Sequence, residues 1–240
     1  MDRGVAQGLS NGNCYRRPVR LSVVIPALNE ANRVVDAINS ARAPGVEVVV
    51  ADGGSRDATR ELAAAAGALV VTSPAGRAEQ LAAGVRASCG DAILLLHADT
   101  RLPRGFDQVV ESALEDARTI GGAFRMRFEE ADWALRVVEW GVRLRTAIFG
   151  LPYGDQALFV RRRTLDAIGG ILRVPIMEDL DLVKAMRGCG RLAMLDQPVT
   201  TSARRYRARG VAKTLFRNAV AAAAWLFDVD RRRVADWYYR

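Results

Sequence analysis

The chain has 240 residues, half of them hydrophobic, and a formal net charge of +8 at pH 7. That length allows one large domain, or one domain with an appendage, around a core of its own. A single histidine and three widely spaced cysteines argue against zinc chemistry built on paired histidines and against a disulfide framework. Charge alone leaves nucleotides, nucleic acids and anionic membranes open as partners, because arginine, which supplies nearly all the positive charge, pairs well with phosphates.

The first residues and the cysteines bear on location. Residues 1–19 are polar and lack the apolar segment of a signal peptide, so we expect a flexible N-terminal arm. No window reaches the ~18 apolar residues that a spanning helix needs. Unpaired cysteines fit a reducing compartment. We therefore expect a cytoplasmic protein.

The first hundred residues alternate between short apolar runs and helical patterns. Apolar runs rich in β-branched residues predict strands at 21–26, 46–52, 68–73 and 92–99. Helices are predicted at 29–41, 58–66 and 76–90, with Asn29 and Asp57 as amino-terminal caps and Gly67 at the end of the second. This alternation predicts an α/β fold with a parallel sheet covered on both faces.

The rhythm changes after Arg104. Helices are predicted at 104–117, 133–149, 181–190 and 211–227, strands at 121–128 and 157–162, and a charged tail at 228–240. The helix at 133–149 carries an apolar stripe, which we expect to pack in the core or beside a substrate rather than to bind a cofactor. Its members are Trp133, Val137, Trp140, Leu144 and Ile148.

Polar residues stand where three of the early strands end. Asp52 and Asp57 follow the second strand, and His97 and Asp99 follow the fourth. Taken singly, each fits a turn, a helix cap or a structural hydrogen bond equally well. Open α/β sheets bind ligands beyond the carboxyl ends of their strands, so the four side chains are expected to converge on one rim and form a site.

The order of four motifs gives the sequence a resemblance to a known family: "VVIPALNE", "ADGGSRD", "HADT" and "MEDLD". Over about residues 21–200 the chain resembles the family 2 glycosyltransferases, which have the GT-A fold. With "PYGDQALFVRR" and "TSARRYRARG" it resembles a small bacterial subgroup with HADT in place of the usual D-x-D, labelled arsenosugar-biosynthesis or carotenoid-glycosyltransferase-like. The resemblance implies a Rossmann-like, mostly parallel central sheet flanked by helices, with acceptor-side helices and a C-terminal helix.

The resemblance also implies a division of the chain. It places a GT-A domain at 20–210, after the arm at 1–19. Residues 211–240 then form a C-terminal helix and tail, packed on that domain or lying at a membrane surface. An apolar stretch flanked by basic residues makes 211–233 a candidate for peripheral membrane contact, at the inner face of the membrane.

The resemblance assigns the donor end of a site. Glu30 is expected near the ribose and Asp52 at the base edge, while Gly53 and His97 stand where the family usually has aspartates. Asp99 is expected to hold Mn²⁺ or Mg²⁺ on the diphosphate, with His97 as a second ligand or as a hydrogen-bond partner of a phosphate or the backbone. The nucleotide-sugar site is expected to contain Pro26, Ala27, Asn29, Glu30, Asp52, Gly53, Arg77, His97, Ala98, Arg204 and Arg205.

The acceptor end follows from "MEDLD" and "PYGDQ". Asp179 matches the family's catalytic base, with Glu178 beside it, and a helix start favours an ionised carboxylate there. Such a base takes the proton of an acceptor hydroxyl, and attack opposite the leaving group inverts the anomeric centre. Tyr153, Asp155 and Gln156 are expected to contact the acceptor.

The sequence thus predicts a metal-dependent, inverting glycosyltransferase that moves a sugar from a UDP- or GDP-linked donor to a hydroxyl of a small or lipid-like acceptor. A noncatalytic nucleotide- or glycan-binding module and a sugar-phosphate nucleotidyltransferase remain alternatives. A nucleic-acid partner is not expected, because the chain lacks basic stripes interleaved with aromatic residues. The sequence names neither the sugar nor the acceptor nor the oligomeric state.

Overall fold

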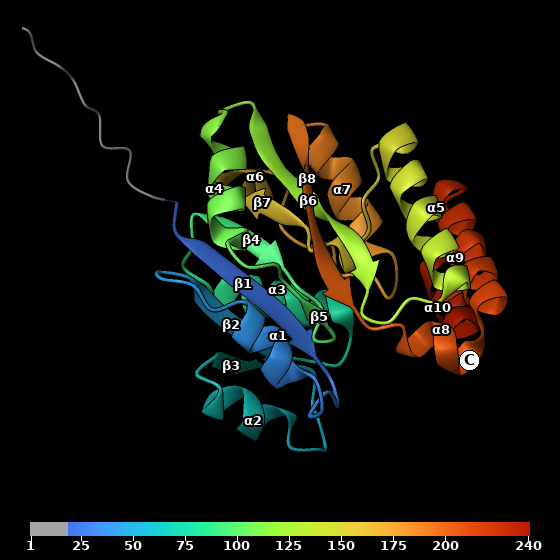
Figure 1. Cartoon of the computed structure of the whole chain (residues 1–240), viewed down its shortest axis with the longest axis horizontal. Coiled ribbons are helices and arrows are strands. Elements are labelled where there is room, and N and C mark those ends of the chain that lie inside the picture. The colour runs from blue at the N-terminus through green and yellow to red at the C-terminus, as the bar shows by residue number, and fades with distance from the viewer. Residues whose placement is uncertain (1–18) are drawn as a thin grey trace, which may run out of the picture.

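The computed structural model describes residues 19–240, so the predicted arm lies outside the described residues except for Val19. The described chain folds around one eight-stranded sheet in the order β3-β2-β1-β4-β7-β6-β8-β5 (Figure 1). The strands are β1 Leu21–Ala27, β2 Glu47–Asp52, β3 Leu69–Thr72, β4 Ala92–Leu95, β5 Thr100–Arg101, β6 Thr119–Phe128, β7 Phe159–Arg161 and β8 Arg191–Thr201.

The first half of the sheet is parallel, as predicted. Strands β2 and β4 both pair with β1 in parallel, and β3 continues the sheet in parallel beyond β2. Strand β7 runs antiparallel to both β4 and β6, and β5 runs antiparallel to β8, so the whole sheet is mixed. The predicted α/β class is confirmed. Val23, Val24 and Ile25 are fully buried because helices cover the sheet on both sides.

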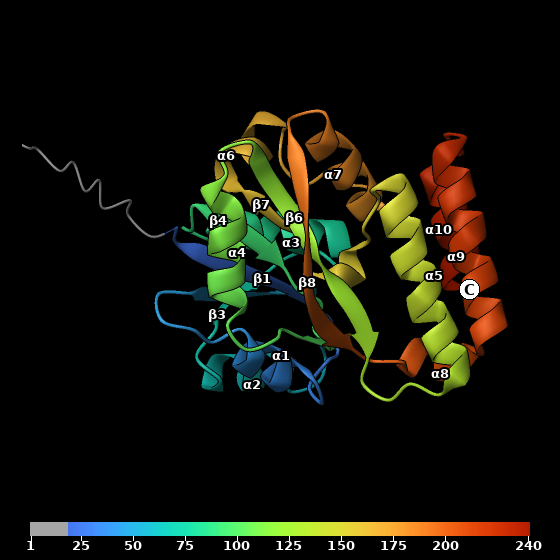
Figure 2. The same ribbon diagram turned by 45° about the horizontal axis from the view of Figure 1, so that its top comes forward.

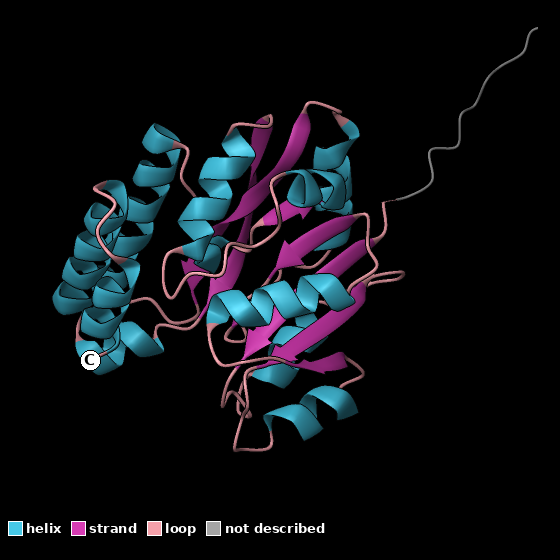
Figure 3. Ribbon diagram, turned by 180° about the vertical axis from the view of Figure 1, so that it is seen from behind, coloured by secondary structure: helices cyan, strands magenta, loops and turns pink. Residues whose placement is uncertain are grey.

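Helices occupy both faces. On one face, α1 and α4 place Ile38 and Phe106 in the larger core cluster. On the other, α3 and α7 contribute Leu81 and Met186 to a second cluster, and Figure 3 shows the helices of this face in front of the sheet. The α-helices are α1 Val34–Ser40, α2 Thr59–Ala65, α3 Arg77–Ala87, α4 Phe106–Glu115, α5 Trp133–Phe149, α6 Arg162–Ala167, α7 Glu178–Arg187, α8 Arg204–Arg209, α9 Val211–Leu226 and α10 Arg231–Tyr239.

The first helix starts later than predicted. It begins at Val34, and Asn29 is not its cap. Asn29 adopts a left-handed φ of 55°, and its side-chain oxygen accepts the N–H of Arg56 at 2.9 Å instead. The cap position of α2 is Ala58 rather than the predicted Asp57, although the carboxylate of Asp57 accepts the N–H of Thr59 at 3.1 Å.

Helices α5, α8, α9 and α10 form a group at one end of the sheet, beyond β6 and β8 (Figure 2). The predicted charged tail contains a helix, because Asp230 caps α10 by accepting the N–H groups of Arg232 and Arg233. Arg231 pairs with Asp181 of α7 at 3.2 Å, and the indole N–H of Trp225 donates to the same carboxylate at 2.7 Å. These contacts tie the C-terminal helices to α7.

The stripe on α5 does not pack in the core, which was one of the two predicted alternatives. Trp133 is 81% exposed, and the remaining members of the stripe are also exposed. The opposite side of the helix is the covered one, where Leu135 and Val138 pack beside Phe128 and Tyr206. Among residues 19–240, no helix has both the length and the apolarity to cross a membrane.

Candidate active site

Strands β1 and β2 end side by side, in register from Ser22 with Glu47 to Ala27 with Asp52. Asp52 is fully buried, and its Oδ2 accepts the N–H groups of Gly54 and Ser55 at 2.9 and 3.0 Å. Its Oδ1 is also buried but has no hydrogen-bond partner in the described part of the chain. A buried acceptor without a partner is costly, so this oxygen is suited to a ligand donor such as a base N–H.

Gly53, the residue where the family usually has aspartate, is held as glycine by its surroundings. A Cβ at Gly53 would stand 2.9 Å from Cδ of Gln80. Gln80 is buried and donates from its amide to the carbonyls of Ala27 and Ala51 at 2.6 and 3.2 Å. Gln80 thus occupies the space that the aspartate would need, a role that the sequence pattern did not reveal.

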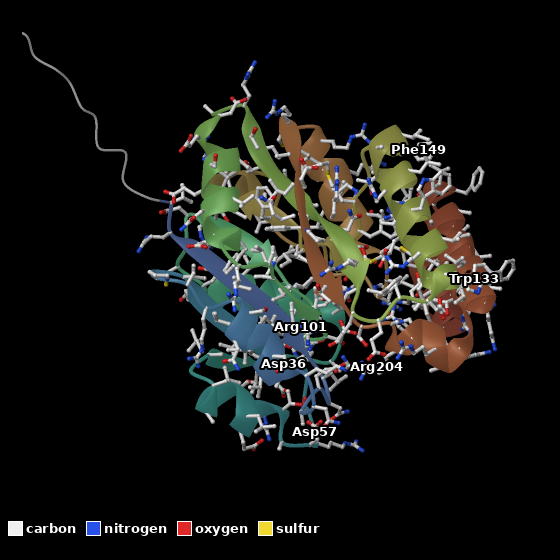
Figure 4. The ribbon with its side chains drawn as sticks, in the orientation of Figure 1. Asp36, Asp57, Arg101, Trp133, Phe149 and Arg204 are labelled. Atoms are coloured by element: carbon white, nitrogen blue, oxygen red, sulfur yellow. The ribbon has the colours of Figure 1, made fainter. Side chains whose placement is uncertain are left out.

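The loop after β1 is joined to α8. Glu30 donates its backbone N–H to Thr59 at 2.8 Å, and its carboxylate accepts from Arg204 at 2.6 Å. Figure 4 labels Arg204 at this junction. The antiparallel pairing of β5 with β8 brings the segment 201–205 there, because Thr100 is opposite Thr201. Glu30 and Arg204, which are distant in sequence, therefore meet at this sheet edge.

Arg77, the first residue of α3, lies between the first two acids of "MEDLD", Glu178 and Asp179, and the histidine. Its guanidinium donates to Glu178, lies 3.4 Å from Oδ2 of Asp179 and 3.3 Å from Nε2 of His97. Burial opposes the charge of Arg77, but the two carboxylates outweigh it and raise its pKa. Arg77 therefore stays cationic and holds both acids in place.

Asp179 and Glu178 open α7 directly after Met177, whose left-handed φ of 66° is unusual for a non-glycine residue. Burial would raise the pKa of Asp179. The charge of Arg77, the N–H of Gly154, the imidazole of His97 and the N–H of Leu180 together outweigh burial and lower the pKa. The Gly154 N–H donates to Oδ2 at 2.8 Å. Asp179 is thus an ionised, fixed carboxylate.

Gly154 was not singled out by the sequence analysis. A Cβ there would lie 3.0 Å from Nε2 of His97 and 3.2 Å from Oδ2 of Asp179. The residue is therefore packed between the two side chains. Its position within "PYGDQ" was the available signal, but only the tertiary contact explains it.

His97 is held neutral. Burial and the neighbouring Arg77 lower its pKa to about 4. Because Nε2 faces the guanidinium of Arg77, that nitrogen serves as a hydrogen-bond acceptor. The partner of Nε2 is thus a guanidinium, which differs from the metal, phosphate and backbone partners that the sequence suggested for His97.

The residues present fit a hard divalent cation only with help from the substrate. Within residues 19–240 no three His, Cys, Asp or Glu side chains are grouped as a metal site. Asp99 lines the cavity that also contains His97, Arg205 and Asp179. Mg²⁺ and Mn²⁺ commonly complete their shells with water and phosphate oxygens, so one carboxylate facing a diphosphate is a suitable protein ligand.

The same cavity extends toward the C-terminal helices, and its walls are rich in tyrosine. Arg145 stacks on the ring of Tyr153, 3.4 Å from its centroid. Asp155 lines the cavity with a buried Oδ1 that lacks a partner among the described residues, and burial raises its pKa. The aromatic wall consists of Phe128, Tyr153, Tyr206, Tyr238 and Tyr239. The two C-terminal tyrosines were missed because the tail was not predicted to be helical.

Ten predicted site residues do not line this cavity: Pro26, Ala27, Asn29, Glu30, Asp52, Gly53, Ala98, Gln156, Glu178 and Arg204. Gln156 is buried. Its amide nitrogen donates to the carbonyl of Phe124, and its amide oxygen accepts the N–H of Tyr153. Ala98 is buried between His97 and Asp99, and Pro26 lies within β1. Gln156 thus supports the loop from behind rather than facing an acceptor.

Solved structures with the same arrangement of elements define the fold. The mannosyltransferase PcManGT from Pyrobaculum calidifontis, solved in complex with GDP-Man and Mn²⁺, matches with a TM-score of 0.65 at 21% identity, over 86% of this chain and 62% of that chain. Glucosyl-3-phosphoglycerate synthase from Mycobacterium tuberculosis, solved with Mn²⁺ and UDP-glucose, matches with a TM-score of 0.55 at 24% identity, over 75% and 70%. The protein has the GT-A fold, with a mixed sheet flanked by helices.

Sequence comparison then gives the family. The chain belongs to glycosyl transferase family 2, whose family model matches residues 22–168, more than half of the chain. The undecaprenyl-phosphate 4-deoxy-4-formamido-L-arabinose transferase of Pseudomonas aeruginosa (strain UCBPP-PA14) is 28% identical over 165 residues, 62% of this chain and 49% of that protein. The chain thus spans about half the length of the curated relatives it matches.

Proposed function

We propose that the protein is a metal-dependent, inverting glycosyltransferase that moves a sugar from a nucleotide-sugar donor to a hydroxyl of a small or lipid-like acceptor. The observation that carries the proposal is one cavity lined by both Asp99 and Asp179. A diphosphate held at Asp99 and a hydroxyl at Asp179 would lie at the two ends of that cavity. Family membership and neighbours solved with Mn²⁺ and sugar nucleotides support the same reading.

The donor is bound by the sheet edge. The free Oδ1 of Asp52 accepts a base N–H, and Glu30, fixed by Arg204, lies toward the ribose. Arg205 reaches the diphosphate from the cavity wall, where a guanidinium can donate two bonds. A bound Mg²⁺ or Mn²⁺ ion at Asp99 supplies neutralisation of the charge that builds up on the leaving diphosphate.

The acceptor hydroxyl is activated by Asp179. As the hydroxyl oxygen forms its bond to the anomeric carbon, the bond from that carbon to the diphosphate breaks on the opposite face, and the hydroxyl proton passes to Asp179. Its lowered pKa keeps Asp179 ionised before the reaction, and general-base help of this kind is worth roughly 10²–10⁴-fold. Asp155 and Tyr153, further along the wall, position the acceptor.

A lipid-like acceptor is supported by the printed name of the curated relatives, which contains a polyprenyl phosphate. The aromatic wall of the cavity suits an apolar portion of such a molecule. We propose a cytoplasmic protein in peripheral contact with the inner face of the membrane, to which residues 211–233 contribute.

Calorimetry with UDP and GDP, with and without Mn²⁺, tests the donor end, and a panel of sugar nucleotides with released nucleotide as readout tests transfer. We expect saturable binding that requires the metal, and release that requires Asp179. Metal-dependent nucleotide binding without release of nucleotide from any sugar nucleotide would favour a noncatalytic nucleotide-binding module. In that case Asp179 would serve only as the ion-pair partner of Arg77. Release of diphosphate from a nucleoside triphosphate and a sugar phosphate would instead indicate a nucleotidyltransferase.

A further inference from the structure

The outer side of α5 exposes large apolar side chains along its whole length. Trp133 is 81% exposed, and Trp140 and Ile148 are each 62% exposed. Spacings of three and four residues keep the stripe on one side of the helix. Figure 4 places Trp133 and Phe149 near the two ends of α5, on the side remote from β1. Tryptophan in this position is costly in water and calls for a covering partner.

Helix α9 continues this surface. Figures 1 and 2 show α9 beside α5 in the same outer group of helices. Its exposed side carries Phe216 at 64%, and the turn that follows carries Leu226 and Phe227 at 70% and 78%. The other exposed apolar residues on this side of α9 are small, namely Ala212, Ala219 and Ala223. We call the exposed apolar side chains of α5, α9 and the turn after α9 the α5–α9 face.

The charges at the border of the α5–α9 face are mainly basic, with exposed acids at its two ends, Asp132 beside Trp133 and Asp228 beside Phe227. Arg136 and Arg143 are exposed on α5 next to the stripe, and Lys213 is exposed on α9; within residues 19–240 no ion pair holds any of them. Glu139, the acid within α5, turns inward and accepts the N–H of Phe128 at 2.7 Å. Helix α9 contains no acid.

These charges distinguish between two partners that could cover the α5–α9 face, a second copy of the chain and a lipid bilayer. In a symmetric pairing of two copies, each face meets itself, so the basic side chains along the sides of α5 and α9 would face an equal excess of positive charge, with acids only at the two ends of the face. An anionic bilayer supplies the opposite charge to the arginines and an apolar layer to the indole rings, which favour the interface between headgroups and acyl chains. We infer that the α5–α9 face docks on an anionic lipid bilayer, with its apolar side chains in the outer acyl region and its arginines on lipid phosphates.

This surface includes part of the segment 211–233 that the sequence suggested and adds to it the apolar stripe of α5, which the sequence did not assign to a membrane. It also adjoins the candidate active site: Asn218 of α9 lines the catalytic cavity from the inner side of the same helix group. Docking would therefore bring the aromatic wall close to the lipid. That consequence rests on the proposed function, whereas the lipid binding itself does not.

Flotation of the full chain with vesicles tests the inference. We expect binding to vesicles of phosphatidylcholine with phosphatidylglycerol, a blue shift of tryptophan fluorescence, and weakening by salt. The double variant Trp133→Ser/Trp140→Ser should bind at least about tenfold more weakly, and Arg136→Gln and Arg143→Gln about fivefold each. The control Leu69→Ser removes a comparably exposed apolar side chain, 48% exposed on β3, and should bind like the parent.

Nucleotide affinity measured in solution separates folding and donor binding from docking, and it should not change in any of these variants. Failure of the parent to bind anionic vesicles would overturn the inference, as would equal binding by the double tryptophan variant. A concentration-dependent dimer that the double variant abolishes, without vesicle binding, would assign the α5–α9 face to a second copy. None of these outcomes alters the test of sugar transfer.

Discussion

The backbone N–H of Gly154 donates to Oδ2 of Asp179 at 2.8 Å, so the loop before β7 holds the candidate base at the start of α7. Arg77 lies on the same oxygen from α3 at 3.4 Å. Three segments that are distant in sequence thereby fix one carboxylate. Preorganisation of this kind is what a proton acceptor needs, since its geometry must be in place before the acceptor arrives.

Replacing Asp179 with asparagine should abolish sugar transfer and spare nucleotide binding. The amide keeps the shape but cannot accept the hydroxyl proton, so we expect a rate loss of roughly 10²–10⁴-fold. The matched control is Asp181→Asn on the same helix, which loosens the contacts to Arg231 and Trp225 and should lower stability far more than rate. Transfer by the Asp179→Asn variant at the parent rate would remove the base from this position.

Replacing Asp99 with alanine should weaken nucleotide affinity only when metal is present. The carboxylate acts through the cation in our proposal, so in chelator the variant and the parent should bind alike. Calorimetry in Mn²⁺ and in chelator makes the comparison. Identical affinities in Mn²⁺ would show that Asp99 is not a ligand.

Two glycines form a matched pair for alanine substitution. Gly154→Ala places a methyl group 3.0 Å from His97 and 3.2 Å from Asp179, and overpacking there should cost about 1–3 kcal/mol of stability together with a loss of transfer. Gly141→Ala in α5 meets nothing within 4 Å and should stabilise by about 0.5–1 kcal/mol through helix propensity. Denaturant unfolding measures both, and a neutral Gly154→Ala variant with full activity would contradict the packing.

The single histidine predicts a pH dependence of stability. Its pKa is about 4 in the folded protein and about 6.5 in the unfolded chain. Between these values the unfolded state binds the extra proton, so the free energy of unfolding should decrease as pH falls from 6.5 to 4, by an amount on the order of 2 kcal/mol. An NMR titration gives the pKa directly, since only one imidazole is present. In Arg77→Gln the pKa should move upward; an ordinary value in the parent would mean that His97 is solvated.

Much of the fold was accessible from periodicity, and the errors have local causes. Buried parallel strands appear as short apolar runs, so β1, β2 and β3 were found close to their observed bounds, whereas β4 begins where predicted but ends four residues earlier. The exposure of the stripe on α5 could not be predicted, because periodicity shows which residues share a side of a helix but not which side is covered. Helix α10 was missed because its residues are charged and its burial comes from packing against Ile176 and Ala221.

Some residues of the candidate site could likewise be placed from the sequence, and others could not. Asp52, His97 and Asp99 could be placed from the sequence because strand ends meet at one edge of a parallel sheet. Gln80 and Gly154 could not, since their roles depend on contacts made across the fold. Tyr238 and Tyr239 required the position of α10 against α7.

The contact of Arg231 with Asp181 joins the last helix to α7 through side chains rather than through the sheet. The part of the aromatic wall that α10 supplies, Tyr238 and Tyr239, is therefore joined to α7 by side-chain contacts rather than by strand pairing. Chimaeras that exchange 211–240 between relatives, with this pair retained, would be a practical route to altered acceptor preference with an unchanged choice of sugar nucleotide.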